Sequence, residues 1–279
     1  QKVRVMDFAT KLLEATGKGY VSYSALKYAA DGSKSQDMKL FEMYMLGLLK
    51  KESDALTFGS LYDCMLLEPE KLQTRFIVLD DSDVILELGS TYKNPRSSNP
   101  YKEWKKEQEE KVRQHNLTIV SKDDWVTAER MIERLNNSEV INHETGELTP
   151  VKHYLTGTTQ HEINAWIGDV PVRGFLDCYS KEHGFIADSK STRSIHGFRY
   201  DVGNFCYDIQ AYIYTQVLGT NEFYWVVQEK SSPYLCGVYR ASDRSLASGE
   251  EKFWTAIANI NKWLNNGART ETFALYGEI

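Results

Sequence analysis

The sequence predicts an α/β fold in which a central mixed sheet, containing a three-stranded meander, is flanked by helices. Three observations support this prediction. Strand-like segments follow one another across short turns between residues 161 and 190. Apolar residues recur with helical spacing in the N-terminal half and again between residues 198 and 218. The length of 279 residues is enough to bury a sizeable core, either as one large domain or as a core with an appended lobe.

The N-terminal half is predicted to be mainly helical. Its helices show broad apolar faces, and Pro69 ends the helix that carries Asp63. Ser121 is the expected N-cap of a later helix. In chain order we expect helices at 7–16, 22–27, 37–50 and 54–67, a strand at 76–79, a loop at 89–100, a helix at 101–114, a strand at 117–120, a helix at 123–135 and a polar connection at 144–149.

The meander follows from residue spacing. Gly168-Asp169 is predicted as a two-residue turn, and a second turn of two or four residues precedes Gly184. In an antiparallel pair, the numbers of two opposed residues have a constant sum. Both candidate turns make that sum odd for the second hairpin. The numbers of Asp177 and Asp188 also have an odd sum, so the two carboxylates are expected on one face. The same rule puts Glu162 opposite Phe175. Because side chains two apart share a face, Lys190 joins Asp188, and the meander is expected to present Glu162, Asp177, Asp188 and Lys190 together.

The C-terminal third continues the sheet and covers it. One helix is predicted from about Phe198 to Leu218, with Gly219 ending it. Tyr207, Gln210 and Tyr214 form a second stripe on that helix, which considered alone indicates packing. Segments 223–230 and 234–241 are predicted as a further hairpin that extends the sheet. The last helix is expected to start at a capping box, residues 248–251.

Composition excludes several classes of protein. No run of about eighteen apolar residues predicts a membrane span. The four widely spaced cysteines favour reduced thiols in the cytoplasm and argue against zinc or an iron-sulfur cluster. Neither a phosphate-cradling loop nor a dinucleotide-binding glycine fingerprint is present, which argues against ATP-driven or nicotinamide chemistry. The net charge of −6 is modest evidence against a nucleic-acid binder, although Lys181, Lys190, Arg193 and Arg199 cluster near the meander.

Several carboxylates on one face repel each other unless a cation neutralises them. Oxygen ligands suit Mg²⁺, with Mn²⁺ as a substitute, better than zinc. A lysine beside such a metal can orient a water or stabilise charge on a phosphate. The alternative is an ordinary exposed ion pair, since Asp-x-Lys also occurs at residues 37–39, where we interpret it as a solvated helix face.

Several segments together resemble a known family, among them Val226–Lys230 followed by Pro233-Tyr234. The chain resembles the PD-(D/E)XK nucleases, and more narrowly their exonuclease VIII (RecE-type) branch of phages and prophages, over most of residues 20–240. The resemblance implies a restriction-endonuclease-like core in which the helix with Gln210 and Tyr214 braces the site. The other segments that carry it are Tyr23–Lys27, Phe58–Pro69, Gly174–Asp177, Ile186–Lys190 and Tyr207–Tyr214.

The resemblance also implies roles for individual residues. Asp177, Asp188 and the Ser189 carbonyl would bind Mg²⁺, Glu162 would complete the metal shell, and Lys190 would position the attacking water. Asp63 stands where the family usually has histidine, and its carboxylate could ligate or polarise in its place. Gly59 in the same helix is expected to allow close packing or the approach of DNA. DNA contacts are expected from Tyr207, Gln210, Tyr214, Ser191, Thr192 and Arg193, although hydroxyl-rich loops such as 191–194 are also common without such a role.

The implied activity is Mg²⁺-dependent 5′ to 3′ digestion of double-stranded DNA from an end, in the cytoplasm of a bacterial host, for phage-type recombination. A ring-shaped homo-oligomer and a single-strand annealing protein are the implied partners. Two alternatives remain open: another PD-(D/E)XK endonuclease or single-strand nuclease, and a catalytically silent DNA-binding module. We expect a mainly helical region at residues 1–150, contributing Asp63, and a nuclease core at 151–279, together forming one continuous domain.

Overall fold

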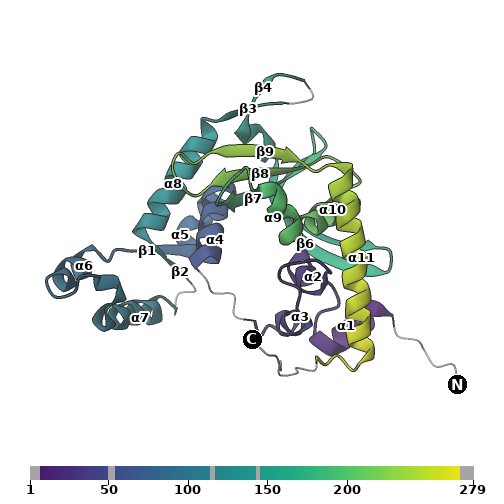
Figure 1. Ribbon diagram of the computed structural model, residues 1–279, viewed down its shortest axis with the longest axis horizontal. Helices are drawn as coiled ribbons and strands as arrows, with labels where there is room; N and C mark the ends of the chain where they lie inside the picture. Colours follow the sequence, from purple (N-terminus) through teal and green to yellow (C-terminus); the bar gives the residue numbers. More distant parts are fainter. Residues whose placement is uncertain (1–6, 50–53, 114–116, 143–144, 271–279) are drawn as a thin grey trace, which may run out of the picture.

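The computed structural model describes residues 7–49, 54–113, 117–142 and 145–270. Residues 50, 114 and 144, at the ends of predicted segments, lie outside this part of the chain. A five-stranded mixed sheet in the order β5-β6-β7-β8-β9 forms its centre (Figure 1). The predicted α/β fold with a central mixed sheet flanked by helices is confirmed. Its strands are β5 (Thr158–Ile167), β6 (Val170–Ser180), β7 (Phe185–Thr192), β8 (Phe223–Glu229) and β9 (Cys236–Arg240).

The meander β5-β6-β7 has the predicted register. Glu162 pairs with Phe175, and Gly168-Asp169 forms the turn between Ile167 and Val170. Cys178 pairs with Ala187, so the residue numbers of opposed positions have an odd sum, as expected. Strand β8 then runs parallel to β7, and β9 returns antiparallel to β8. The further hairpin predicted from segments 223–230 and 234–241 is therefore also confirmed.

The helix predicted from Phe198 to Leu218 is two helices, and that prediction is wrong at one point. Helix α9 (Phe198–Asn204) and helix α10 (Tyr207–Leu218) meet at Phe205 and Cys206, and the φ of Cys206 is +59°. Apolar spacing continues through this point, so periodicity alone could not show the break. Helix α10 packs its apolar residues against the sheet, in a cluster that includes Ile209, Ile213 and Leu176.

Helix α11 (Asp243–Asn265) begins earlier than predicted. Its N-cap is Ser242, whose hydroxyl accepts a hydrogen bond from the Ser245 amide, so the capping box at 248–251 lies inside the helix. The first three helices pack against α11 and the sheet (Figure 1), and their buried Leu12, Leu26 and Phe41 belong to the same core cluster. These helices are α1 (Phe8–Thr16), α2 (Tyr23–Ala29) and α3 (Met38–Met45).

A second hydrophobic cluster joins helix α4 (Asp54–Leu67) to helix α8 (Lys122–Asn136). Ser121 caps α8 as predicted, accepting a hydrogen bond from the Asp124 amide. A Cβ on Gly59 in α4 would have no heavy atom within 4 Å, so close packing is not the reason for this glycine. Short elements follow α4: the turn η1 (Pro69–Lys71), α5 (Leu72–Arg75) and β1 (Phe76–Leu79), which pairs in parallel with β2 (Thr118–Ser121).

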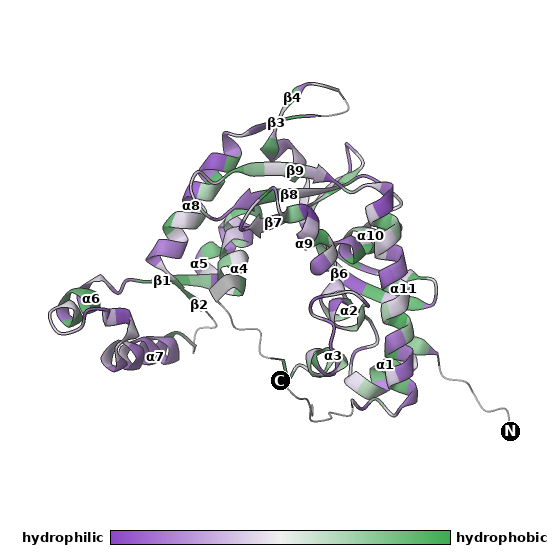
Figure 2. Cartoon of the chain, in the orientation of Figure 1, coloured by the Kyte–Doolittle hydropathy of each residue, from purple (hydrophilic) through white to green (hydrophobic). Residues whose placement is uncertain are grey.

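Two further features project from this body. Helices α6 (Ser82–Gly89) and α7 (Asn99–Arg113) extend from β1 and β2, and Figure 2 shows α7 as predominantly hydrophilic. The predicted loop 89–100 contains the end of α6, the turn η2 (Pro95–Ser97) and the start of α7, so it is partly helical. The predicted connection at 144–149 contributes to an antiparallel hairpin of β3 (Glu139–Ile141) and β4 (Leu148–Pro150), followed by η3 (Val151–Leu155). Among the described helices, none has the length and apolar character needed to cross a membrane.

Candidate functional site

Two aspartates lie where the pairing of β6 and β7 ends. The last paired residues are Cys178 and Ala187, and the next position on each strand is Asp177 or Asp188. The Asp177 side chain takes the place of the backbone ladder here, because its Oδ2 accepts a hydrogen bond of 2.8 Å from the Ser189 amide. Asp188 is 1% exposed. The structure therefore brings together the two carboxylates that strand spacing placed on one face.

Lys190 and Gln210 hold the Asp188 carboxylate from two sides. Lys190 Nζ forms an ion pair with Oδ2, and Gln210 Nε2 donates a hydrogen bond of 2.6 Å to Oδ1. Lys190 Nζ also lies 5.0 Å from the centre of the Tyr207 ring and 3.3 Å from the Ser189 carbonyl oxygen. One carboxylate, one ammonium group and one amide thus form a connected network, so the exposed ion pair considered as the alternative does not describe this hairpin.

Burial and charge shift the pKa values of this network. Burial, followed by the neighbouring Asp188 and Asp63, raises the pKa of Asp177 well above its ordinary value. Burial lowers the pKa of Lys190, but the Asp188 and Asp177 carboxylates outweigh that effect, so its pKa is raised overall. Lys190 therefore carries its positive charge at neutral pH. A protonated amine can donate hydrogen bonds but cannot accept a proton from water.

Asp63 approaches this network from helix α4. The negative charge of Asp63 contributes to the raised pKa of Asp177. Burial raises the pKa of Asp63 itself to about 7, although the positive charges of Lys190 and Lys230 oppose that shift. The preceding residue fastens the helix to the sheet: the buried Tyr62 hydroxyl donates a hydrogen bond of 2.6 Å to Gln228 Oε1. The same amide donates to the Met131 carbonyl at 2.7 Å. Helix α4 thus places the carboxylate of Asp63 near the network, and the role of Asp63 in catalysis stays a prediction.

Glu162 is not brought to the aspartates. It lies on the predicted face, but its Oε1 is 2.7 Å from the Arg173 guanidinium, and its side chain is 46% exposed. Gln160 faces Asp177 instead, with Nε2 3.3 Å from Oδ1. Gln160 has a φ of +49°, a backbone conformation that no turn signal in the sequence indicated. The role of Glu162 in a metal shell stays a prediction.

Helix α10 braces the site from behind. The Tyr214 hydroxyl donates a hydrogen bond of 2.8 Å to the Phe175 carbonyl. A Cβ on Gly174 would lie 3.0 Å from that hydroxyl oxygen, so the tyrosine fits against a strand position that has no side chain. Burial raises the pKa of Tyr214, as it does for Tyr207. Tyr214 and Gln210 are 5% and 6% exposed, and contact of these two with DNA stays a prediction.

The hydroxyl-rich loop after β7 divides into buried and exposed residues. Thr192 is buried, with its hydroxyl 3.3 Å from the Ser194 carbonyl. Ser191 is half-buried and Arg193 is exposed. Of these three predicted contacts, Arg193 is therefore the one that presents its side chain to solvent.

Tyr23, at the start of α2, belongs to the site although strand spacing gave no sign of it. Burial raises its pKa well above the ordinary value, and Lys190, Tyr207 and Asp188 lie close enough to act on it. Its hydroxyl donates a hydrogen bond of 2.8 Å to the Phe205 carbonyl. The one signal that could have identified it is the family resemblance of the segment Tyr23–Lys27.

The donor set can accommodate a hard divalent cation. The buried Asp188 and the half-buried Asp177 lie together, and Gln210 Oε1 and Ser189 Oγ are buried without a hydrogen-bond partner. Mg²⁺ is commonly held by one or two carboxylates, with water completing its shell. Within the described ranges, no three or more His, Cys, Asp or Glu side chains are grouped as a metal cage. The residues present therefore fit a cation bound by Asp177 and Asp188 with the Ser189 carbonyl or Gln210 Oε1.

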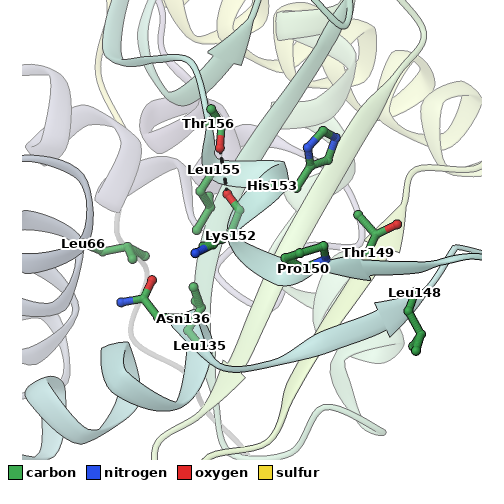
Figure 3. A pocket seen from close by; sticks show the side chains of 10 residues that line it. All are labelled: Leu66, Leu135, Asn136, Leu148, Thr149, Pro150, Lys152, His153, Leu155 and Thr156. Carbon is green, nitrogen blue, oxygen red and sulfur yellow. Dashed lines mark hydrogen bonds between the residues drawn. The ribbon is translucent and has the colours of Figure 1, made fainter.

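A pocket of about 560 Å³ lies elsewhere, beside the β3–β4 hairpin (Figure 3). Its lining contains no carboxylate and none of the residues predicted for the site, so we do not assign the chemistry to it. The lining residues are Leu66, Leu135, Asn136, Leu148, Thr149, Pro150, Lys152, His153, Leu155 and Thr156.

Comparison with known families agrees with this geometry. The family described as a PDDEXK-like domain of unknown function (DUF3799) matches residues 22–272. The chain belongs to this family. No match was found among curated proteins. A crystal structure from Eubacterium rectale, described as a "putative exonuclease", is similar to this DUF3799 domain with a TM-score of 0.59 and 16% sequence identity, covering 97% of this chain and 89% of the other.

At this level of identity the crystal structure shows a shared fold. The DUF3799 match and that fold support a nuclease, which confirms the predicted PD-(D/E)XK superfamily. The narrower exonuclease VIII branch stays a prediction.

Proposed function

We propose that the protein is a Mg²⁺-dependent exodeoxyribonuclease of the exonuclease VIII type. The observation that carries this proposal is the network of Asp177, Asp188, Lys190 and Gln210 at the end of the β6–β7 pairing. Its residue types, strand positions and bracing helix fit the PDDEXK-like family to which the chain belongs. The fold shared with the structure described as a "putative exonuclease" adds support at the level of architecture.

Each residue of the network has a distinct task in phosphodiester hydrolysis. Asp177 and Asp188 would hold the metal, with Ser189 and Gln210 as neutral oxygen donors. A bound divalent cation supplies a water of low pKa and stabilises charge on the phosphate oxygens. Lys190 keeps its proton, because its pKa is raised by the two aspartates, and so acts as a hydrogen-bond donor that positions the attacking water or a phosphate oxygen. Gln210 fixes the orientation of Asp188.

The substrate and direction rest on the family resemblance. We infer digestion of double-stranded DNA from an end, in the 5′ to 3′ direction, for phage-type recombination. The same resemblance supports a ring-shaped homo-oligomer in the bacterial cytoplasm and a single-strand annealing protein that receives the 3′ tail. Arg193 and Tyr207 are the proposed contacts to the DNA backbone nearest the site.

Digestion of linear duplex DNA labelled at either the 5′ or the 3′ end tests the proposal. We expect early release of the 5′ label with Mg²⁺, no release with excess chelator, and loss of activity in Asp188→Ala and Lys190→Ala. Covalently closed circles should remain intact. Cutting of circles would favour an endonuclease, and metal binding without any product at enzyme excess would favour a silent DNA-binding module.

A further inference from the structure

An aromatic side chain stands exposed at the break between α9 and α10. Phe205 occupies the position between the two helices and is 40% exposed. Single exposed apolar side chains are common on proteins, so exposure alone indicates nothing. The backbone around Phe205 and its connection to the site distinguish it from the other exposed aromatic residues.

The break between α9 and α10 is held by specific backbone contacts. Cys206 adopts a left-handed conformation with a φ of +59°, which is unfavourable for a residue with a side chain, and its own side chain is fully buried. The Phe205 amide donates to the Asp201 carbonyl at 2.9 Å, and the Phe205 carbonyl accepts the Tyr23 hydroxyl at 2.8 Å. Backbone contacts on both sides therefore hold Phe205 in place, and an unfavourable conformation is maintained next to it.

The ring of Tyr207 lies between Phe205 and Lys190. Its ring centre lies 5.8 Å from that of Tyr207, and Lys190 Nζ lies 5.0 Å from the Tyr207 ring centre. Tyr23 contacts the same Tyr207 ring, with a centre-to-centre distance of 6.2 Å. Stacked nucleotides in one strand follow each other at about 3.4 Å, so Phe205 lies within a few nucleotides of a phosphate held at Lys190.

We propose that Phe205 is a stacking site for an unpaired base of the DNA strand that enters the active site. Aromatic side chains bind single-stranded DNA by stacking on bases, and they do so without sequence preference because every base has a flat face. A stacking residue fixed beside the phosphate-binding lysine would hold the frayed end of a duplex in register for cleavage. This inference rests on the proposed nuclease function and adds a base-binding residue to it.

The test measures binding separately from cleavage. Duplexes carry a four-nucleotide single-stranded 5′ or 3′ end, made either with normal bases or with abasic analogues of the same charge. Dissociation constants are measured by fluorescence anisotropy with excess chelator at one salt concentration, for wild type, Phe205→Ala and Phe205→Trp. Trp166→Ala is the matched control, because Trp166 is also an exposed aromatic residue (64%) but lies far from the site. Gln160 on β5 contacts Asp177 in the site, and Trp166 is six residues further along the same strand, about 20 Å away.

We expect Phe205→Ala to weaken binding of one base-bearing end by roughly 5- to 150-fold, the range measured for loss of a stacked base. The abasic substrate should bind wild type and Phe205→Ala equally, since a merely structural role of Phe205 would affect both substrates. Phe205→Trp and Trp166→Ala should bind like wild type. Equal affinity of wild type and Phe205→Ala for base-bearing ends would overturn the inference.

A parallel cleavage assay of the wild type keeps the two ideas separate. Metal-dependent cleavage with no effect of Phe205→Ala on binding would overturn the stacking site and leave the nuclease intact. Base-dependent binding through Phe205 without any cleavage would overturn the nuclease and leave the stacking site. A wild type that neither binds nor cleaves these DNAs would overturn both.

Discussion

The five-stranded sheet with its packed helices and the lobe of β1, β2, α6 and α7 differ in where they place charged side chains. The sheet region buries charged and polar side chains, with Asp188 1% and Gln210 6% exposed. The lobe leaves apolar side chains in water, with Leu86 80% and Ile77 39% exposed. Its helix α7 carries exposed ion pairs such as Lys105–Glu109, the kind that contributes little to stability.

The difference shows that the unfavourable burial of charge is concentrated at the site on the sheet. Burying a carboxylate is unfavourable unless charges and hydrogen bonds compensate it, and the compensation at Asp188 comes from Lys190 and Gln210 on two different elements. The lobe contains no comparable buried charge among its described residues. It is fastened by contacts such as the Tyr101 hydroxyl, which donates to Asp81 Oδ2 at 2.6 Å. Substitutions at buried polar residues of the sheet region should therefore change activity, whereas substitutions at exposed residues of the lobe should change neither activity nor stability by much.

The largest effect is expected from Asp177→Asn. Activity should fall about a thousandfold, equivalent to about 4 kcal/mol of transition-state stabilisation, because one anionic metal ligand is lost. Stability in chelator should rise, since the asparagine keeps an acceptor for the Ser189 amide without burying a charge. Thermal unfolding and a cleavage assay measure the two effects, and Asp169→Asn, an exposed aspartate in the β5–β6 turn, should change neither.

The same variant carries a pH signature. The folded-state pKa of Asp177 is raised above its ordinary value of 3.8, so between these two values the folded protein binds a proton that the unfolded chain has released. This group therefore favours the folded state less as pH rises through its folded pKa. The melting temperature of Asp177→Asn should accordingly exceed that of wild type by more at high pH than near pH 4. A difference that shrinks with rising pH would contradict the assignment.

Two glycines give an effect of intermediate size. A Cβ on Gly249 in α11 would lie 2.1 Å from the Asp208 carbonyl oxygen of α10, so Gly249→Ala should destabilise the protein by about 3 kcal/mol. Gly59→Ala should stabilise it by about 0.5–1 kcal/mol, because the new methyl group meets open space in a helix. Denaturant unfolding of both variants measures the contrast. If Gly59→Ala lowers DNA cleavage while raising stability, the approach of DNA is the reason for that glycine.

The sequence predicted the parts of the site that depend on a fixed period. Strand alternation and turn length placed Asp177 beside Asp188, and the same rule put Glu162 opposite Phe175. The rule could not show that Arg173 binds Glu162, because that contact depends on side-chain reach across the strands. The break at Cys206 and the approach of Tyr23 depend on packing between distant segments, which leaves no periodic trace.

The smallest effect is expected in the lobe. Leu86→Gln keeps a good helix former in α6 and removes an apolar side chain that is already 80% exposed, so stability should change by less than about 0.5 kcal/mol. Leu176→Ala, at a fully buried leucine of β6, should cost about 2–5 kcal/mol. Denaturant unfolding compares the two, and sedimentation records the state of association of each variant. A loss above 2 kcal/mol in Leu86→Gln would break the comparison, because it would mean that the apolar surface of α6 is covered in solution.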